Sequence, residues 1–244
     1  MLIGLEYEYF FGVMKNFTDI ILHIPHSSGR IEENDLEKWS GDIESCIRRL
    51  TDWHTDKLFA SELDGVHAMV FDYNRFYCDV ERLVNDPMEE IGQGIVYRRF
   101  GDCVRNLAED EVNKINNIYF AWHRRLADLC ATCVAPLIVD CHSFPTDMAE
   151  DVDICIGFND DWSNPGDELL KLIFDLFVNA GYRVAFNRPY SNSMVPQGNG
   201  VQNCRSIMIE VNKSVYLDAD GYTISAGLQR INELLNQLYK IILQ

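Results

Sequence analysis

Short apolar runs alternate with stretches of helical periodicity along most of the chain. We predict strands at residues 19–25, 66–72, 76–80, 136–140, 152–158, 182–186 and 205–211. We predict helices at residues 54–64, 107–133, 164–181 and 225–243. The clearest of them is 107–133, where Trp122, Leu126 and Leu129 recur at three- and four-residue spacing. Alternation of short strands and helices predicts an α/β fold.

The segment 164–181 carries signals for both ends of a helix. Asn164 is a suitable N-cap, Pro165 suits the first helical position, and Gly181 lies just past the end. The segment 187–204 is rich in Asn, Ser, Gly and Pro, which predicts a long loop. Loops of this length in compact domains are often functional.

The composition is that of a globular protein with a strong excess of acid. The chain has 244 residues, of which 47% are hydrophobic, and 21 Lys and Arg stand against 38 Asp and Glu, a net charge of −17. We expect one domain over residues 1–244. The charge argues against nucleic acid and against an anionic membrane surface as partners, because both bind clustered Lys and Arg. No run approaches the roughly 18 apolar residues of a membrane helix.

The cysteines favour a reducing compartment. The N-terminus, MLIGLEYEYFFGVMK, lacks the basic region of a signal peptide. Several of the eight cysteines, among them Cys78 and Cys155, lie in apolar runs, where a free thiol behaves as a small core residue. We therefore expect a cytoplasmic protein. Cys130 and Cys133 form a CxxC without a second pair at zinc-finger spacing, which favours a helix face over a metal or redox site.

Polar side chains occur where the predicted strands end, which is where α/β sheets bind ligands. His26 follows the strand 19–25, and Asp140 and His142 follow the strand 136–140. Two imidazoles and a carboxylate are the ligand set of a catalytic Zn²⁺, with a fourth position open for water. The alternative for His142 is a core or loop histidine bonded to backbone.

The segment TDWHTDKL offers three further ligand candidates, Asp52, His54 and Asp56. On a helix, Asp52 and Asp56 share a face and His54 does not, so at most two of them reach one site. We favour Asp52 as the carboxylate ligand. The alternative is a helix N-cap at Thr51 or Asp52, which does not exclude metal binding.

Glu210 lies within the apolar run SIMIEV and is expected to be buried. A buried carboxylate is costly unless it is paired, neutralised or functional. Beside a metal-bound water it would be a general base. The alternative is a structural ion pair with Arg205, Arg75 or Arg82.

The segment NRFYCDVER places Asn74, Arg75, Asp79 and Arg82 close together in or after a strand. Arginine recognises carboxylates through two parallel hydrogen bonds. These arginines therefore indicate an anionic substrate, held locally in an acidic protein. The alternative is a set of surface salt bridges.

Six segments, in order, resemble the motifs of the N-formylglutamate amidohydrolase family. They are PHSSGR (25–30), TDWHTDKL (51–58), NRFYCDVER (74–82), WHRRL (122–126), VDCHS (139–143) and IEVNKSVYLD (209–218). The resemblance covers nearly the whole chain. It implies a relative of zinc carboxypeptidases and amidoacylases, with a central mixed, mostly parallel sheet flanked by helices. It also implies hydrolysis of N-formylglutamate to glutamate and formate, a step of histidine degradation, with a divalent metal, expected to be Zn²⁺.

The resemblance also assigns roles by position. The metal ligands are His26, Asp52 and His142, the catalytic glutamate is Glu210, and the groups for the substrate carboxylate or carbonyl are Arg75 and Arg82. His54 and His123 fall on motif positions without an assigned role, and Asp56 and Asn74 are further candidates. The resemblance implies a small anionic N-acyl amino acid as substrate and leaves homo-oligomer formation open.

The chain also departs from the family pattern. Glu81 stands where the family has Asn, and the loop SNSMVPQGNG differs from the family's Gly-rich loop. The substrate is therefore N-formylglutamate or a related N-acyl amino acid. One alternative is a non-catalytic member that binds a small acidic ligand. A cysteine hydrolase using Cys141 and His142 is disfavoured, because adjacent side chains of a strand point to opposite faces.

Overall fold

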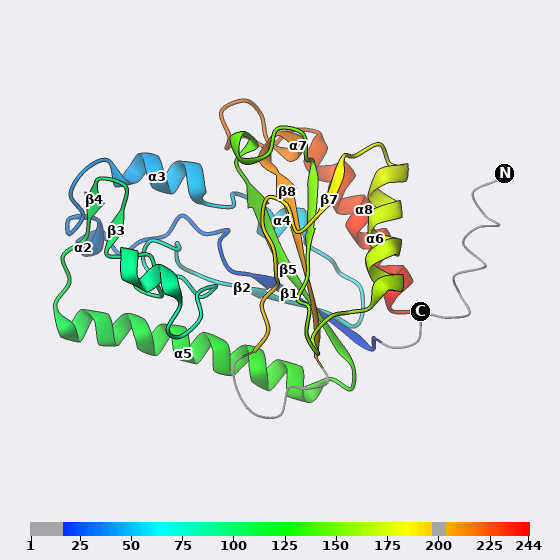
Figure 1. Cartoon of the computed structure of the whole chain (residues 1–244), viewed down its shortest axis with the longest axis horizontal. Helices are drawn as coiled ribbons and strands as arrows, with labels where there is room; N and C mark the ends of the chain where they lie inside the picture. Colours follow the sequence, from blue (N-terminus) through cyan, green and yellow to red (C-terminus); the bar gives the residue numbers. More distant parts are fainter. Residues whose placement is uncertain (1–16, 197–203) are drawn as a thin grey trace.

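A six-stranded sheet forms the centre of the fold (Figure 1). The computed structural model describes residues 17–196 and 204–244. In spatial order the strands are β2 (Val66–Val70), β1 (Asp19–Ile24), β5 (Pro136–Phe144), β8 (Arg205–Asn212), β6 (Ile154–Gly157) and β7 (Val184–Phe186). The first four run parallel, whereas β6 is antiparallel to β8 and β7 is parallel to β6. The mixed, mostly parallel sheet that the resemblance implied is confirmed.

Helices cover both faces of the sheet (Figure 1). On one face, α6 (Asp167–Asn179) and α8 (Gly227–Ile242) share an apolar core with strand residues such as Leu22 and Val139. On the other face, α5 (Glu109–Thr132) packs against the residues between them, such as Ile21 and Ile138. All residues of β5 are buried because this strand lies inside the sheet and is covered on both sides.

The other elements are short. They are α2 (Glu33–Leu36), α3 (Ile43–Leu50), α4 (Thr55–Leu58), α7 (Lys213–Tyr216), the 3₁₀ turns η1 (Pro87–Ile91) and η2 (Thr146–Met148), and the hairpin of β3 (Arg99–Phe100) and β4 (Cys103–Val104). Trp39, Phe76 and Tyr97 form a small apolar cluster with residues of α3 and the hairpin. Within residues 17–196 and 204–244, no helix has the length and apolar character of a membrane span.

Two predicted helices begin or end elsewhere. The helix predicted at 54–64 is only the four-residue α4, because Asn232 of α8 donates to the carbonyl oxygens of residues 57, 58 and 60 that a longer helix would use. The N-cap of α6 is Gly166 and not Asn164. The Asn164 side chain instead accepts a hydrogen bond from the Gly166 N–H and forms a turn before the helix.

The strand predicted at 76–80 is wrong, because residues 71–82, here the 71–82 loop, form successive turns. The buried guanidinium of Arg105 donates to the carbonyl oxygens of Phe76 and Tyr77, at 3.0 and 3.2 Å, in place of a neighbouring strand. Arg105 also binds Asp35 Oδ1 through Nε at 3.1 Å and through its terminal nitrogen at 2.5 Å. One buried cation therefore holds the loop in its irregular shape.

Replacing Arg105 by Met is expected to lower the free energy of unfolding by about 3–5 kcal/mol, because it leaves the Asp35 carboxylate and the loop carbonyls buried without a partner. Urea unfolding measures this change. Arg183→Met, which breaks an exposed pair with Asp153, is the matched control and is expected to cost much less. Equal effects of the two substitutions would contradict the role given to Arg105.

Candidate metal centre and active site

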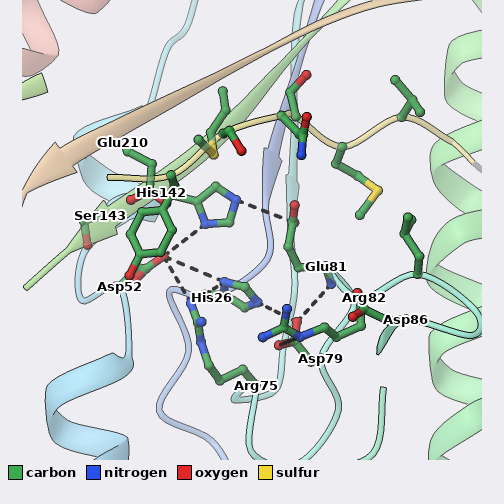
Figure 2. Close-up of a pocket in the computed structure, with 18 of the residues that line it drawn as sticks. His26, Asp52, Arg75, Asp79, Glu81, Arg82, Asp86, His142, Ser143 and Glu210 are labelled. Carbon is green, nitrogen blue, oxygen red and sulfur yellow. Dashed lines mark hydrogen bonds and ion pairs between the residues drawn. The ribbon is translucent and has the colours of Figure 1, made fainter. Parts of the chain in front are cut away.

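A cavity of about 480 Å³, here the central cavity, lies at the carboxyl ends of β1, β5 and β8 (Figure 2). Its lining includes every residue that the sequence assigned to metal, base or substrate: His26, Asp52, Arg75, Arg82, His142 and Glu210. The parallel register pairs His142 of β5 with Glu210 of β8. Asp52 joins them because its backbone N–H donates to the carbonyl oxygen of His26 at 2.9 Å. The fold thus gathers residues that are up to 184 positions apart (210 minus 26).

His26, Asp52 and His142 are buried and each points one ligand atom at the same small volume (Figure 2). The three ligand atoms lie within 4.8 Å of one another. Asp52 Oδ2 is 3.2 Å from Nδ1 of His142 and 3.8 Å from Nδ1 of His26. Three protein ligands at this spacing leave coordination positions for water or substrate.

A carboxylate holds the second ring nitrogen of each histidine. Nε2 of His26 lies 2.9 Å from Asp79 Oδ1, and Nε2 of His142 lies 3.0 Å from Asp140 Oδ1. Arg75 donates to Nδ1 of His26 at 2.5 Å, so the ring proton of His26 is on Nε2 and Nδ1 carries a lone pair. Carboxylates that fix the tautomer in this way are the usual outer partners of metal-bound histidines.

Charge coupling prepares these groups for a cation. Burial lowers the pKa of His26 to about 4, so its ring is neutral near pH 7. Burial alone would also lower the pKa of His142, but the carboxylates of Asp140 and Glu81 raise it well above its ordinary value. The pKa of Asp52 is lowered although burial opposes this, because His142 donates a hydrogen bond to it. Without metal, His142 therefore carries a proton between two carboxylates, which a divalent cation would displace.

The donor set fits a zinc ion. Two imidazole nitrogens and one carboxylate oxygen from three different segments converge, and their outer partners are in place. Two further groups of donors lie close together in the described part of the chain: His23, Glu81 and Asp140, and Asp19, His67 and Cys133. The first group surrounds His142 and belongs to the same site, whereas the second is partly exposed and includes no residue that lines the central cavity.

His23 supports the centre, although the sequence did not single it out. Trp122 Nε1 donates to His23 Nε2 at 3.0 Å, so the proton of this ring is on Nδ1 and is donated to Asp140 Oδ1 at 2.8 Å. The backbone N–H of Met194 donates to Asp140 Oδ2 at 2.8 Å. Asp140 is therefore held at both oxygens, and its position fixes the ring of His142. His23 escaped notice because it lies inside the apolar run of β1.

Replacing Asp140 by Asn is expected to weaken Zn²⁺ binding about 10–100-fold, the usual loss when an outer partner of a metal ligand is removed. Competition with a chromogenic chelator measures the affinity. Asp110→Asn, which removes an exposed carboxylate from the first turn of α5, is the matched control. An unchanged affinity of the Asp140 variant would show that Asp140 does not position His142.

Glu210 is buried in the wall of the central cavity, with an exposed fraction of 7%. Its Oε2 has no hydrogen-bond partner among the described residues. Within these residues, the ion pairs of Arg75 and Arg82 go to Asp52 and Asp79 and not to Glu210. Burial raises the pKa of Glu210 to about 8. The arrangement leaves a carboxyl group free to exchange a proton with a molecule in the cavity.

Glu210 is also expected to reduce the stability of the metal-free protein as pH rises. Its pKa is raised from 4.5 in the unfolded chain to about 8 in the fold, so folding favours the protonated form. The stabilisation is complete below about pH 4.5 and is lost as pH rises through about 8. Glu210→Gln, which is always neutral, should therefore match wild type near pH 4 and exceed it near pH 9 by on the order of a few kcal/mol. Urea unfolding with chelator present tests this, and a difference that is the same at both pH values would contradict it.

Arg75 and Arg82 reach the central cavity from the 71–82 loop and not from a strand. The Arg75 guanidinium lies 3.6 Å from Asp52 Oδ2, beside the ligand set. Arg82 lies 3.6 Å from Asp79 Oδ2 and donates to the hydroxyl of Tyr97 at 3.2 Å. The side chains of Arg75 and Arg82 keep 19% and 25% of their surface exposed. Both can therefore contact a molecule in the cavity.

The four additional candidates do not line the central cavity. His54 Nε2 bonds to the carbonyl oxygen of Tyr222, and His123 Nε2 bonds to that of Val80. Asn74 donates to the hydroxyl of Thr51 and to the carbonyl oxygen of Ser28, and Asp56 is partly exposed on α4. Asn74 and His123 thus support the loops around the site and make no contact with the cavity.

Two other features agree with the sequence patterns. Cys141 points away from His142 into the apolar core, where burial raises its pKa well above the ordinary value, so it is no nucleophile for this cavity. The predicted loop 187–204 contributes residues 190–195 to the cavity wall. Residues 197–203 of this loop lie outside the described residues.

Comparisons with known proteins agree with this geometry. The model of the N-formylglutamate amidohydrolase family matches residues 18–217. An N-formylglutamate amidohydrolase from Ralstonia eutropha JMP134 has a similar structure, with a TM-score of 0.73, 20% sequence identity and 93% of each chain covered. A gene product of Agrobacterium tumefaciens superposes with a TM-score of 0.63 at 17% identity, over 93% of this chain and 92% of that one. No curated protein sequence matches the chain.

Proposed function

Because the chain belongs to the N-formylglutamate amidohydrolase family, and so is a hydrolase of carbon–nitrogen bonds other than peptide bonds, we propose that it hydrolyses the amide of a small N-acyl amino acid. The substrate class is N-formylglutamate or a close relative. The observation that carries the proposal is the convergence of His26, Asp52 and His142 in one cavity with a buried, unpaired Glu210.

The residues that would hold the metal are His26, Asp52 and His142, with Asp79 and Asp140 as their outer partners. A bound divalent cation supplies Lewis-acid polarisation of the amide carbonyl and lowers the pKa of water towards roughly 7. The buried setting strengthens these electrostatic effects, since little water screens them.

Glu210 is the proton carrier of the proposed reaction. It accepts a proton from water as the water oxygen forms a bond to the carbonyl carbon. It then delivers this proton to the amide nitrogen as the carbon–nitrogen bond breaks, which leaves a carboxylic acid and a free amine. The pKa of about 8 permits both directions of transfer near neutral pH.

The arginines hold and stabilise the substrate. Arg75, which lies beside Nδ1 of His26 and near Asp52, donates to the carbonyl oxygen as negative charge develops there. Arg82 binds the substrate carboxylate, since its guanidinium reaches the cavity away from the ligand set. The two groups fix the amide relative to Glu210.

A substrate panel with and without chelator tests the proposal. N-formyl and N-acetyl amino acids are incubated with the protein, and formate or acetate release is measured. We expect release that a chelator abolishes and that added Zn²⁺ restores. Ligand binding without any release would instead support a non-catalytic family member.

A further inference from the structure

Outside the metal ligands, the wall of the central cavity carries more acid than base. Glu81, Asp86 and Asp161 line it in addition to Glu210. Arg75 and Arg82 are the Arg and Lys side chains among the described lining residues. The part of the neighbouring loop outside the described residues, QGNGVQN, contains no Lys or Arg. The cavity therefore has few cations with which to bind a substrate that carries two carboxylates.

One of the two guanidinium groups is committed to the reacting end of the cavity. Arg75 donates to His26 Nδ1 and lies 3.6 Å from Asp52, two of the three ligands. Arg82, 3.6 Å from Asp79 and bonded to Tyr97, is the cation that remains for a carboxylate of the substrate. One carboxylate of a bound molecule is thus matched, and a second is not.

Glu81 presents an unused acceptor in the same wall (Figure 2). Its Oε2 is shielded from bulk water and has no hydrogen-bond partner among the described residues, while 25% of the side chain stays exposed. The nearest donors are Nε2 of His142 at 3.5 Å and Nδ1 of His23 at 3.8 Å. Both nitrogens are closer to Asp140 Oδ1, at 3.0 and 2.8 Å, and donate there. An unpaired buried acceptor is costly, and a donor on a bound molecule would satisfy it.

We infer that the central cavity takes N-acyl amino acids with one carboxylate and a side chain that carries N–H donors, a basic side chain above all, in place of the second carboxylate of N-formylglutamate. This inference rests on the proposed amide hydrolysis. Arg82 binds the single carboxylate and Glu81 accepts a hydrogen bond from the side chain. Asp86 and Asp161 add to the attraction for a cation, and a side-chain carboxylate beside Glu81 would be repelled without a cation to compensate it.

The kinetic test compares N-formyl-L-lysine, N-formyl-L-leucine and N-formyl-L-glutamate with the Zn²⁺-loaded protein, by formate release. We expect kcat/KM for the lysine substrate to exceed that for the glutamate substrate roughly tenfold or more. Glu81→Gln should lower this ratio through a loss for lysine and a gain for glutamate, and should leave leucine little changed. Glu37→Gln removes the same charge from an exposed position and should leave the ratio as in wild type.

A binding measurement keeps the inference testable without turnover. Calorimetry with the Glu210→Gln protein should show tighter binding of N-formyl-L-lysine than of N-formyl-L-glutamate. Tighter binding and faster hydrolysis of the glutamate compound, unaltered by Glu81→Gln, would overturn the inference and leave the proposed hydrolysis standing. Selective binding of the lysine compound with no hydrolysis of any substrate would support the inference and overturn the proposed catalysis. Binding of neither compound would overturn both.

Discussion

Replacing Glu210 by Gln is expected to lower kcat for amide hydrolysis by about 10²–10⁴-fold, the usual contribution of a general acid–base group. Gln has nearly the shape of Glu and cannot carry a proton between water and the leaving nitrogen. Because the proposed metal ligands are three other residues, the variant should keep its metal. Metal analysis and formate release on one preparation separate these two properties.

The control for Glu210 is Glu109→Gln, an exposed residue in the first turn of α5. It should retain the kcat of wild type. If Glu210→Gln keeps its metal and its rate, the base is another group. If it loses metal together with rate, Glu210 supports the metal centre and its role as proton carrier is unproven by this variant.

His142→Ala is expected to abolish metal binding and turnover together. The substitution removes one of three ligands and leaves Asp140, Glu81 and Asp52 without the ring that lies between them. The loss of affinity should exceed the roughly 10–100-fold that an outer partner contributes. Zinc content after gel filtration and formate release measure the two effects.

His54→Ala is the matched control for this experiment. His54 belongs to the same motif as Asp52, but its ring bonds to the carbonyl oxygen of Tyr222, outside the central cavity. The variant should keep its zinc and its turnover. Loss of zinc from the His54 variant and not from the His142 variant would reverse the assignment of ligands.

The strand ends and their chemistry could be predicted from the sequence because local pattern determines them. His26 and His142 each follow or end an apolar run, and Glu210 interrupts one, so burial pattern and side-chain chemistry suffice to single them out. That His142 and Glu210 are neighbours depends on strand register, which no local pattern contains. The motif resemblance supplied this missing information.

The 71–82 loop and the outer partners could not be predicted in the same way. The loop has a strand-like composition, and only the distant side chain of Arg105 keeps it from pairing as a strand. His23 is one polar residue in an apolar strand, and its role appears only when Trp122 and Asp140 are placed around it. These features depend on contacts between residues about 30 to 120 positions apart, which tertiary structure decides.

Titration of chelator-treated protein with Zn²⁺, followed by formate release, tests the central claim most directly. The claim is that one ion, held by His26, Asp52 and His142, is required for amide hydrolysis. The rate should be negligible without metal, rise in proportion to added Zn²⁺, and level off at one ion per chain. A full rate in the metal-free protein, or a rate that Zn²⁺ does not change, would contradict the claim.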